Sequence, residues 1–74
     1  MSHERITRDP KIMQGKPCIA GTRVPVDVIL EDLSDGMSIH DVTQSYEGVT
    51  EEDVRAALEY AAEYLRQESV IAAE

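Results

Sequence analysis

The side chains that could do chemistry are few and widely spaced. The sequence has two histidines, His3 and His40, and a single cysteine, Cys18. Ser38 stands two residues before His40, but no nucleophile elbow surrounds it, and a chain of 74 residues has little room for a walled pocket. We therefore interpret His40 as a surface side chain and Cys18 as a small buried one.

The remaining candidates for chemistry have simpler local explanations. Glu51, Glu52 and Asp53 could hold a cation, but acidic residues are also what the first turn of a helix favours. Gly15 and Gly21 do not stand between a long strand and a helix, as a nucleotide-binding loop requires. A structural zinc is disfavoured because there is no second cysteine. We expect no catalytic, cofactor-binding or metal-binding residues, no cofactor and no enzymatic activity.

The charges are divided unevenly along the chain, whose net charge is −8. Residues 1–23 hold five basic and two acidic side chains, whereas residues 24–74 hold two basic and thirteen acidic ones. Such a division favours two surfaces with different partners. Alternatively, the acidic helices only keep a small protein soluble, or they pair with the cations, and Arg23 could clamp a carboxylate. The five basic residues of the first part are Arg5, Arg8, Lys11, Lys16 and Arg23.

The chain that must position these charges divides near residue 24. Residues 5–23 are rich in proline and glycine, and we predict that they form a small β-arm, turned at Asp9-Pro10 and closed as a hairpin by residues 14–17. A lone hairpin is barely stable, so Ile12, Cys18 and Ile19 are expected to bury against the helices or a partner chain. The expected strand pairs are Ile6-Thr7, Ile12-Met13 and Cys18-Ile19.

Residues 25–66 are predicted to form three helices, and residues 67–74 a frayed tail. The first helix begins at Pro25 and ends at Gly36, as a first-turn proline and a left-handed glycine indicate. The other two helices begin with capping boxes, Ser38 with Asp41 and Thr50 with Asp53.

The third helix is expected to be the longest, with Val54, Leu58, Ala61 and Leu65 facing inward at helical spacing. A short second helix, a turn and a longer third helix are the outline of a helix-turn-helix bundle. The predicted fold is therefore mostly α: a homeodomain-like three-helix bundle with a short N-terminal β-hairpin arm, forming one domain over residues 1–74.

An ordinary helix-turn-helix protein would place its third helix in the major groove, but here that helix is acidic and phosphates would repel it. The basic arm is the better candidate for contact with duplex DNA. The acidic body favours a basic protein partner, for which a nuclease is a natural example. The residues expected to bind that partner are Glu51, Glu52, Glu59, Tyr60, Glu63 and Tyr64.

The size of the chain favours association. Small folds usually need a disulfide, a metal or a partner chain, and a single cysteine allows no disulfide within the chain. We therefore expect a homodimer. The free thiol and the lack of an apolar leader favour the cytoplasm, and the short apolar runs exclude a membrane span.

The chain resembles a widespread prokaryotic family, domain of unknown function four-three-three, over about residues 5–66. The Gly21-Thr22-Arg23 signature is the most specific part, and Glu47 departs from the family, which often has proline after the tyrosine. The first matching stretch is Ile6-x-x-Asp9-Pro10-x-Ile12-x-x-Gly15-x-Pro17-x-Ile19-x-Gly21-Thr22-Arg23-Val24-x-Val26. The later ones are Leu33-x-x-Gly36-x-Ser38, Tyr46 and Thr50-x-x-Asp53-Val54-x-Ala56-Ala57-Leu58-x-Tyr60-Ala61.

This resemblance implies a homeodomain-like three-helix protein with an N-terminal β-arm. Family members are frequently interpreted as antitoxins similar to the VapB type, encoded beside a toxin that resembles PIN-domain ribonucleases. For this chain the resemblance implies an antitoxin that neutralises such a ribonuclease and binds operator DNA. The residues leave two alternatives open, a stand-alone DNA-binding regulator that uses the basic arm and a structural protein-interaction module.

Overall fold

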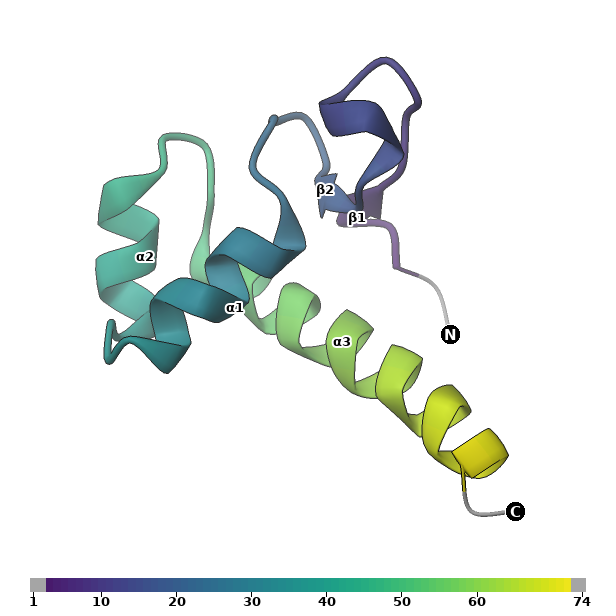
Figure 1. Cartoon of the computed structure of the whole chain (residues 1–74). Coiled ribbons are helices and arrows are strands. Elements are labelled where there is room, and N and C mark those ends of the chain that lie inside the picture. The colour runs from purple at the N-terminus through teal and green to yellow at the C-terminus, as the bar shows by residue number, and fades with distance from the viewer. Residues whose placement is uncertain (1–2, 73–74) are drawn as a thin grey trace.

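The computed structural model describes the chain from residue 3 to residue 72, with side chains as far as residue 67. The described part is mostly helical, with three helices and a short N-terminal antiparallel sheet, as the sequence predicts (Figure 1). The elements are β1 (Ile6–Thr7), the 3-10 turn η1 (Met13–Gly15), β2 (Cys18–Ile19), α1 (Val26–Ser34), α2 (Ile39–Ser45) and α3 (Glu51–Ala72).

The arm is a two-stranded sheet closed by a long loop. Ile6 pairs with Ile19 and Thr7 with Cys18, and the Ala20 N–H donates to the Arg5 carbonyl at 2.8 Å. Asp9 turns the chain as expected, because its carbonyl accepts from the Ile12 N–H at 2.8 Å.

The strand expected at Ile12-Met13 is wrong. Met13, Gln14 and Gly15 all have positive φ, at 50°, 59° and 85°, which reverses the chain and is incompatible with a strand. Residues 8–17 therefore form a loop with η1 inside it, rather than a third strand and a tight turn.

Local side-chain chemistry sets the helix ends. Pro25 is the N-cap of α1 rather than its first helical residue, and Gly36 ends α1 with φ of 101°. Both predicted capping boxes are present. Ser38 and Asp41 exchange hydrogen bonds of 3.0 and 3.1 Å, and Thr50 and Asp53 do so at 3.0 and 3.1 Å.

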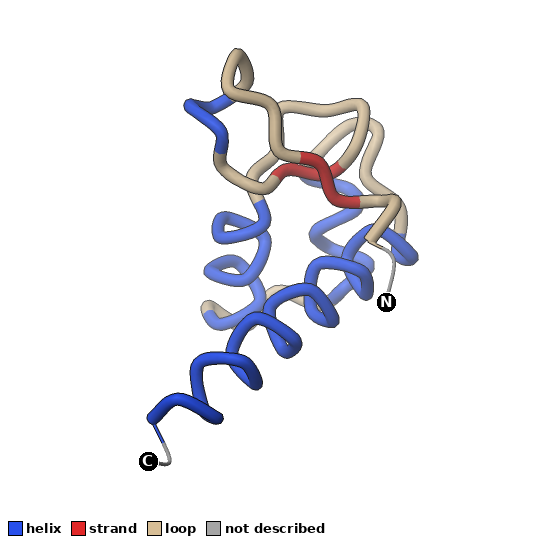
Figure 2. Tube along the Cα trace, turned by 90° about the vertical axis from the view of Figure 1, so that its right-hand side faces the viewer, coloured by secondary structure: helices blue, strands red, loops and turns tan. Residues whose placement is uncertain are grey.

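The core draws residues from the arm and from all three helices. Figure 2 shows the two strands lying across the helices, which places Ile6 and Ile19 in the interior. Cys18 is also buried, as predicted, whereas Ile12 is half-buried. The buried cluster consists of Ile6, Ile19, Val26, Ile29, Val42, Val49, Val54 and Ala57.

The inward stripe predicted for α3 is only partly correct. Val54 is buried, and so is Ala57, which was expected to widen the stripe, but Leu58 and Leu65 are 41% and 57% exposed. Length explains the difference. A helix of 22 residues spans about 33 Å, whereas α1 and α2, with 9 and 7 residues, span about 14 and 11 Å. The far half of α3 therefore projects beyond the helices that could cover it (Figure 1).

The helix also continues to Ala72, past the limit expected at residue 66. Residues 67–72 are thus helical where a frayed tail was expected, because nothing in that stretch, neither glycine nor proline, interrupts the helix. Residues 73 and 74 lie outside the described residues. Within the described part, no helix combines the length and the apolar character needed to cross a membrane.

Candidate functional site

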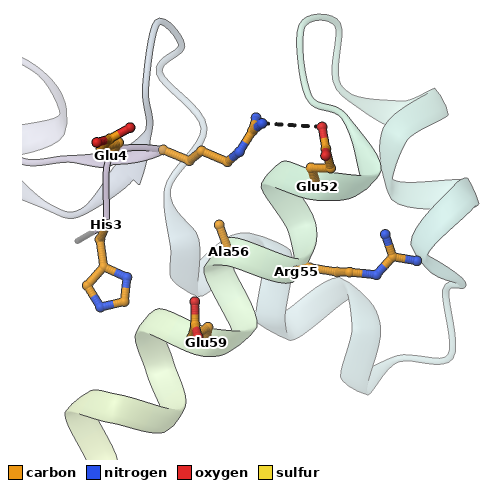
Figure 3. Close-up of a pocket in the computed structure, with 7 residues that line it drawn as sticks. His3, Glu4, Glu52, Arg55, Ala56 and Glu59 are labelled. Carbon is orange, nitrogen blue, oxygen red and sulfur yellow. Dashed lines mark hydrogen bonds and ion pairs between the residues drawn. The ribbon is translucent and has the colours of Figure 1, made fainter. Parts of the chain in front are cut away.

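An open cleft lies where the arm meets the first turns of α3 (Figure 3). Its volume is about 660 Å³, and charged side chains dominate its walls. Glu52, Arg55, Ala56 and Glu59 recur on one face of α3 at helical spacing, opposite Glu4 on the arm. The cleft therefore presents charged groups of both signs.

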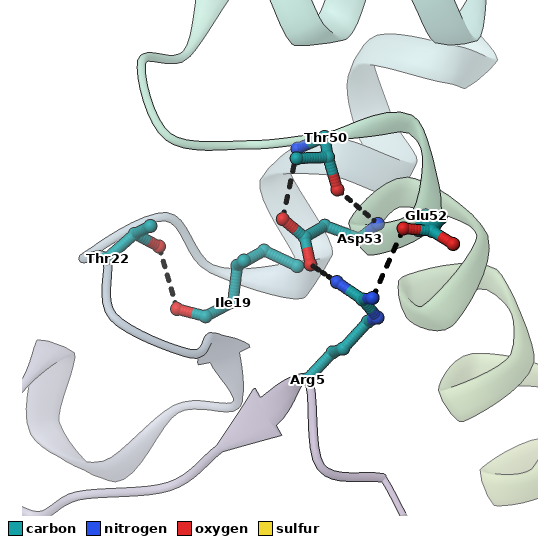
Figure 4. Close-up of polar contacts among 6 residues, drawn as sticks. All are labelled: Arg5, Ile19, Thr22, Thr50, Glu52 and Asp53. Atoms are coloured by element: carbon teal, nitrogen blue, oxygen red, sulfur yellow. Dashed lines mark hydrogen bonds and ion pairs between the residues drawn. The ribbon is translucent and has the colours of Figure 1, made fainter.

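Arg5 joins the arm to α3 at the inner edge of this cleft (Figure 4). Its guanidinium donates to Asp53 Oδ1 at 2.9 Å and to Glu52 Oε1 at 3.2 Å. Asp53 also caps α3 through Thr50, so one nearly buried carboxylate holds both the helix start and the arm. Arg5, not Arg23, is the residue that clamps carboxylates, because it directly precedes β1, which packs on α3.

The electrostatics of Asp53 follow from these contacts. Burial by itself would raise the pKa of Asp53, but the hydrogen bonds from the Thr50 backbone and from Arg5 outweigh burial and hold the pKa below its ordinary value. Asp53 is therefore ionised at neutral pH and forms an ion pair with Arg5, whose side chain is 48% exposed.

A second group of contacts fixes the rest of the arm to the middle of α3. The Arg8 guanidinium donates to the Tyr60 hydroxyl at 2.6 Å and lies 5.9 Å from the centre of that ring. His3 stacks edge-on against Tyr60 at 5.2 Å and hydrogen-bonds with Glu63 at 2.7 Å. The hydrogen bond with His3 lowers the pKa of Glu63.

The other three arm cations are exposed. Lys16 lies 3.3 Å from Asp27 at the start of α1. Lys11 and Arg23 form no ion pair with any residue in the described part of the chain. Of the five cations predicted to contact nucleic acid, Arg5 and Lys16 are thus paired within the chain, and Arg8 rests on an aromatic ring.

The predicted partner-binding residues all lie on α3. Glu51, Glu52 and Glu59 are exposed, and Glu51 lies 3.6 Å from Arg55. Tyr60 is half-buried under the arm, whereas Tyr64 is 53% exposed. These residues spread over more than half of the circumference of α3, and Glu51, Glu52 and Glu63 pair with Arg55, Arg5 and His3, so among the four glutamates only Glu59 forms no ion pair with a described residue.

An apolar groove beside α3 was not foreseen from the sequence. It has a volume of about 360 Å³ and runs between α1 and the far half of α3. Its walls include Val26 and Leu30 of α1 and Ala61, Tyr64 and Leu65 of α3. The signal that could have revealed it is the mismatch between the long apolar pattern of the third helix and the short helices available to cover it.

Two further residues were considered for chemistry, Cys18 and His40, and both have the surroundings of ordinary structural residues. Cys18 is buried, and this burial raises the pKa of its thiol, which disfavours the reactive thiolate. His40 is exposed on α2. Over the described residues, no three histidine, cysteine or acidic side chains are grouped so that they could hold a metal ion.

Comparison with known proteins places this fold and site in a family. The model of the family described as "Protein of unknown function (DUF433)" matches residues 6–61, which include the arm, α1, α2 and the covered half of α3. The chain belongs to DUF433. A crystal structure of a DUF433 member from Anabaena variabilis ATCC 29413 is similar, with a TM-score of 0.77 and 27% sequence identity, over 95% of this chain and 69% of that chain. No curated protein matches.

The DUF433 match begins at Ile6, the first residue of the pair that anchors the arm, and ends at Ala61, where α3 leaves the globule. The family model thus covers the packed unit and stops before the projecting turns of α3. Neither the family description nor the similar structure assigns an activity.

Proposed function

We propose that this protein binds a basic protein partner through the acidic residues of α3, as an antitoxin that neutralises a ribonuclease resembling PIN-domain toxins. The observation that carries the proposal is the distribution of charge after folding. The chain has 15 acidic and 7 basic residues, and two arm cations, Arg5 and Lys16, form ion pairs with carboxylates of the same chain. These pairs leave the net charge of −8 unchanged, and α3 alone holds six acidic and two basic residues.

A negatively charged helix supports this kind of partner for a physical reason. Complementary charge accelerates encounter and fixes the orientation of two proteins, while apolar contacts supply most of the affinity. The exposed ring of Tyr64 lies beside Glu63 and at the edge of the apolar groove. Tyrosine is enriched among residues that dominate binding energy, so Tyr64 is well placed as an anchor.

Co-purification with the product of the neighbouring gene tests the proposal. We expect a stable complex and loss of ribonuclease activity when that product is a basic nuclease. Replacing Glu51 and Glu52 with glutamine should slow association and weaken the complex by roughly tenfold. Replacing Glu31 and Glu47 with glutamine changes the net charge equally but alters exposed acids off α3, and should leave the affinity unchanged. The absence of a complex, or equal effects of both double variants, would count against the proposal.

Contact of the arm with duplex DNA is a second candidate. Lys11 and Arg23 favour it, because both are exposed and form no ion pair within the described part of the chain. A mobility-shift titration at several salt concentrations would test it. Each phosphate contact contributes a slope of about −0.9 in log affinity against log salt, so Lys11→Ala with Arg23→Ala should flatten the slope, whereas Arg55→Ala on α3 should not. No shift at low salt would eliminate this candidate.

A further inference from the structure

The middle and far part of α3 carry an apolar face that the described part of its own chain covers only in part. Leu58, Ala61, Ala62 and Leu65 follow one another at spacings of three, one and three residues, which places them on one side of the helix. Leu58 and Leu65 are 41% and 57% exposed, and the groove beside α1 continues this face through Ala61. Leu58 and Leu65 lie two turns apart on one side of the helix with Ala61 and Ala62 between them, so they form a patch rather than scattered surface residues.

We propose that a second copy of this chain covers this face, with the two α3 helices packed antiparallel about a two-fold axis that passes between Ala61 and Ala62. Leu58 and Leu65 lie at equal distances on either side of that midpoint. The two-fold axis therefore brings Leu58 of each copy opposite Leu65 of the other. The alanines at the centre allow the two helices to approach closely.

The charges beside the apolar face are self-complementary in the same register. Glu59 and Arg66 are seven residues apart, so they lie on the same flank of α3, and they stand on opposite sides of the proposed axis. The axis brings Glu59 of each copy within reach of the partner's Arg66, about one turn or less along the helix. Neither Glu59 nor Arg66 forms an ion pair with another described residue of its own chain.

This symmetry is what favours a second copy over another occupant. A two-fold interface must be complementary to itself. This face meets that condition because an acid and a base lie on the same flank, and the antiparallel axis sets Glu59 of one copy about 3 Å along the helix from Arg66 of the other. The net charge of −8 on each copy opposes association. The leucines must therefore supply the affinity, and the two charge pairs set the register.

Sedimentation equilibrium of the full chain tests the proposal. We expect a concentration-dependent dimer below roughly 0.5 mM, a range in which modest interfaces associate. Leu58→Glu and Leu65→Glu should each give a monomer that keeps its helical circular dichroism, because both positions are exposed in the single chain. Met13→Glu, at an equally exposed apolar residue of the arm, is the control and should remain dimeric.

Charge reversal tests the antiparallel register. Glu59→Arg and Arg66→Glu should each weaken the dimer by about tenfold or more, and the double variant should recover most of the loss. A wild-type chain that is monomeric throughout this range overturns the proposal. So does a dimer that both leucine variants leave intact, or a double variant no tighter than either single one. A face that captures a different protein while the chain stays monomeric also overturns it.

Discussion

Asp53 is the one buried charged residue in the described part of the chain, and its contacts join the arm to α3. Its carboxylate accepts from the Thr50 N–H at 3.0 Å and from Arg5 at 2.9 Å, and it is only 7% exposed. Removing it would leave the Thr50 N–H without its side-chain acceptor and the guanidinium of Arg5 with Glu52 as its remaining carboxylate partner. Its role joins segments that are 48 residues apart, so it concerns the tertiary fold and not only the helix.

We expect Asp53→Ala to lower the free energy of unfolding by about 2 kcal/mol, combining the loss of a capping box with the loss of a charge-assisted hydrogen bond. Asp41→Ala is the matched control. It removes the same box from α2, but its carboxylate is exposed and has no arginine partner, so about 0.5–1 kcal/mol is expected. Urea denaturation at neutral pH measures both. Equal losses would show that the clamp with Arg5 contributes nothing.

Asp53 should also affect how the free energy of unfolding changes at acidic pH. Its pKa in the folded chain is below the ordinary value, so as pH falls the unfolded chain binds the proton first. Its stabilising contribution is therefore full above about pH 5 and is lost as pH falls through the folded pKa. Denaturation between pH 7 and pH 3 should show a shallower decline in Asp53→Ala than in the wild type. Parallel declines would contradict this assignment.

Gln14 is held in a backbone conformation that costs free energy. Its φ is 59° and its side chain is exposed, so no contact compensates the left-handed strain at this position. We expect Gln14→Gly to raise the free energy of unfolding by up to about 1 kcal/mol, the relief of strain exceeding the added chain entropy. Lys16→Gly, where φ is −63°, should instead lose about 0.5–1 kcal/mol. Thermal or urea unfolding distinguishes the two, and destabilisation by Gln14→Gly would contradict the described turn.

The long helix α3 has two halves with different surroundings. Ala57 is fully buried in the core, whereas beyond Ala61 the helix borders the groove and solvent and contacts the N-terminal segment through the hydrogen bond between His3 and Glu63. Backbone hydrogen bonds that lie outside the packed core open with little free energy. In dilute solution, amides near Ala57 should exchange with deuterium only through global unfolding, and amides near Gln67 should exchange orders of magnitude faster. The amide of Ile29, in the covered helix α1, is the internal reference.

Uniform protection along α3 in dilute protein would contradict this division. At high concentration the proposed dimer should add protection near Leu65 and leave Ile29 unchanged. The same experiment therefore separates a helix stabilised by its own chain from one stabilised by a second copy.

The same two halves show what sequence reasoning could and could not reach. Both capping boxes, with Ser38 and Thr50, and the turn at Asp9 were predicted correctly because their chemistry lies within three residues. The hydrophobic periodicity predicted correctly that α3 is a helix. It did not show how short the helices that cover α3 are, so Leu58 and Leu65 were wrongly predicted to face inward.

Of the residues that line the cleft, Arg5, Glu52 and Glu59 were named from the sequence, but the contacts between the arm and α3 were not predicted. The contacts of Arg5 with Asp53, Arg8 with Tyr60 and His3 with Glu63 span 48, 52 and 60 residues. Such contacts depend on how the arm lies across α3, which no local pattern specifies. The prediction of a basic arm and an acidic body therefore matches the order of charges along the sequence. It did not specify that Arg5 and Lys16 pair with carboxylates of the same chain.

The overall shape of the molecule follows from the projecting helix. The extents are 41 × 30 × 20 Å, and the radius of gyration is 12.7 Å, whereas a compact chain of this length has about 11 Å. The extra length is the far half of α3, and it widens the surface on which the acidic residues are spread. The molecule therefore has a small core and a large, negatively charged surface.

The net charge of −8 leads to a prediction about salt. Self-repulsion among 15 acidic residues destabilises the compact state, while the chain's ion pairs are mostly exposed and worth little each. Screening should weaken the repulsion more than it weakens the pairs, so the melting temperature should rise by roughly 4 °C or more between 20 mM and 500 mM sodium chloride. The measurement is differential scanning calorimetry at one protein concentration, so that association does not vary. Chloride is used because sulfate stabilises proteins by exclusion from their surface. A fall in melting temperature would mean that the ties of the arm to α3, led by Arg5 with Asp53, outweigh the repulsion of the whole surface.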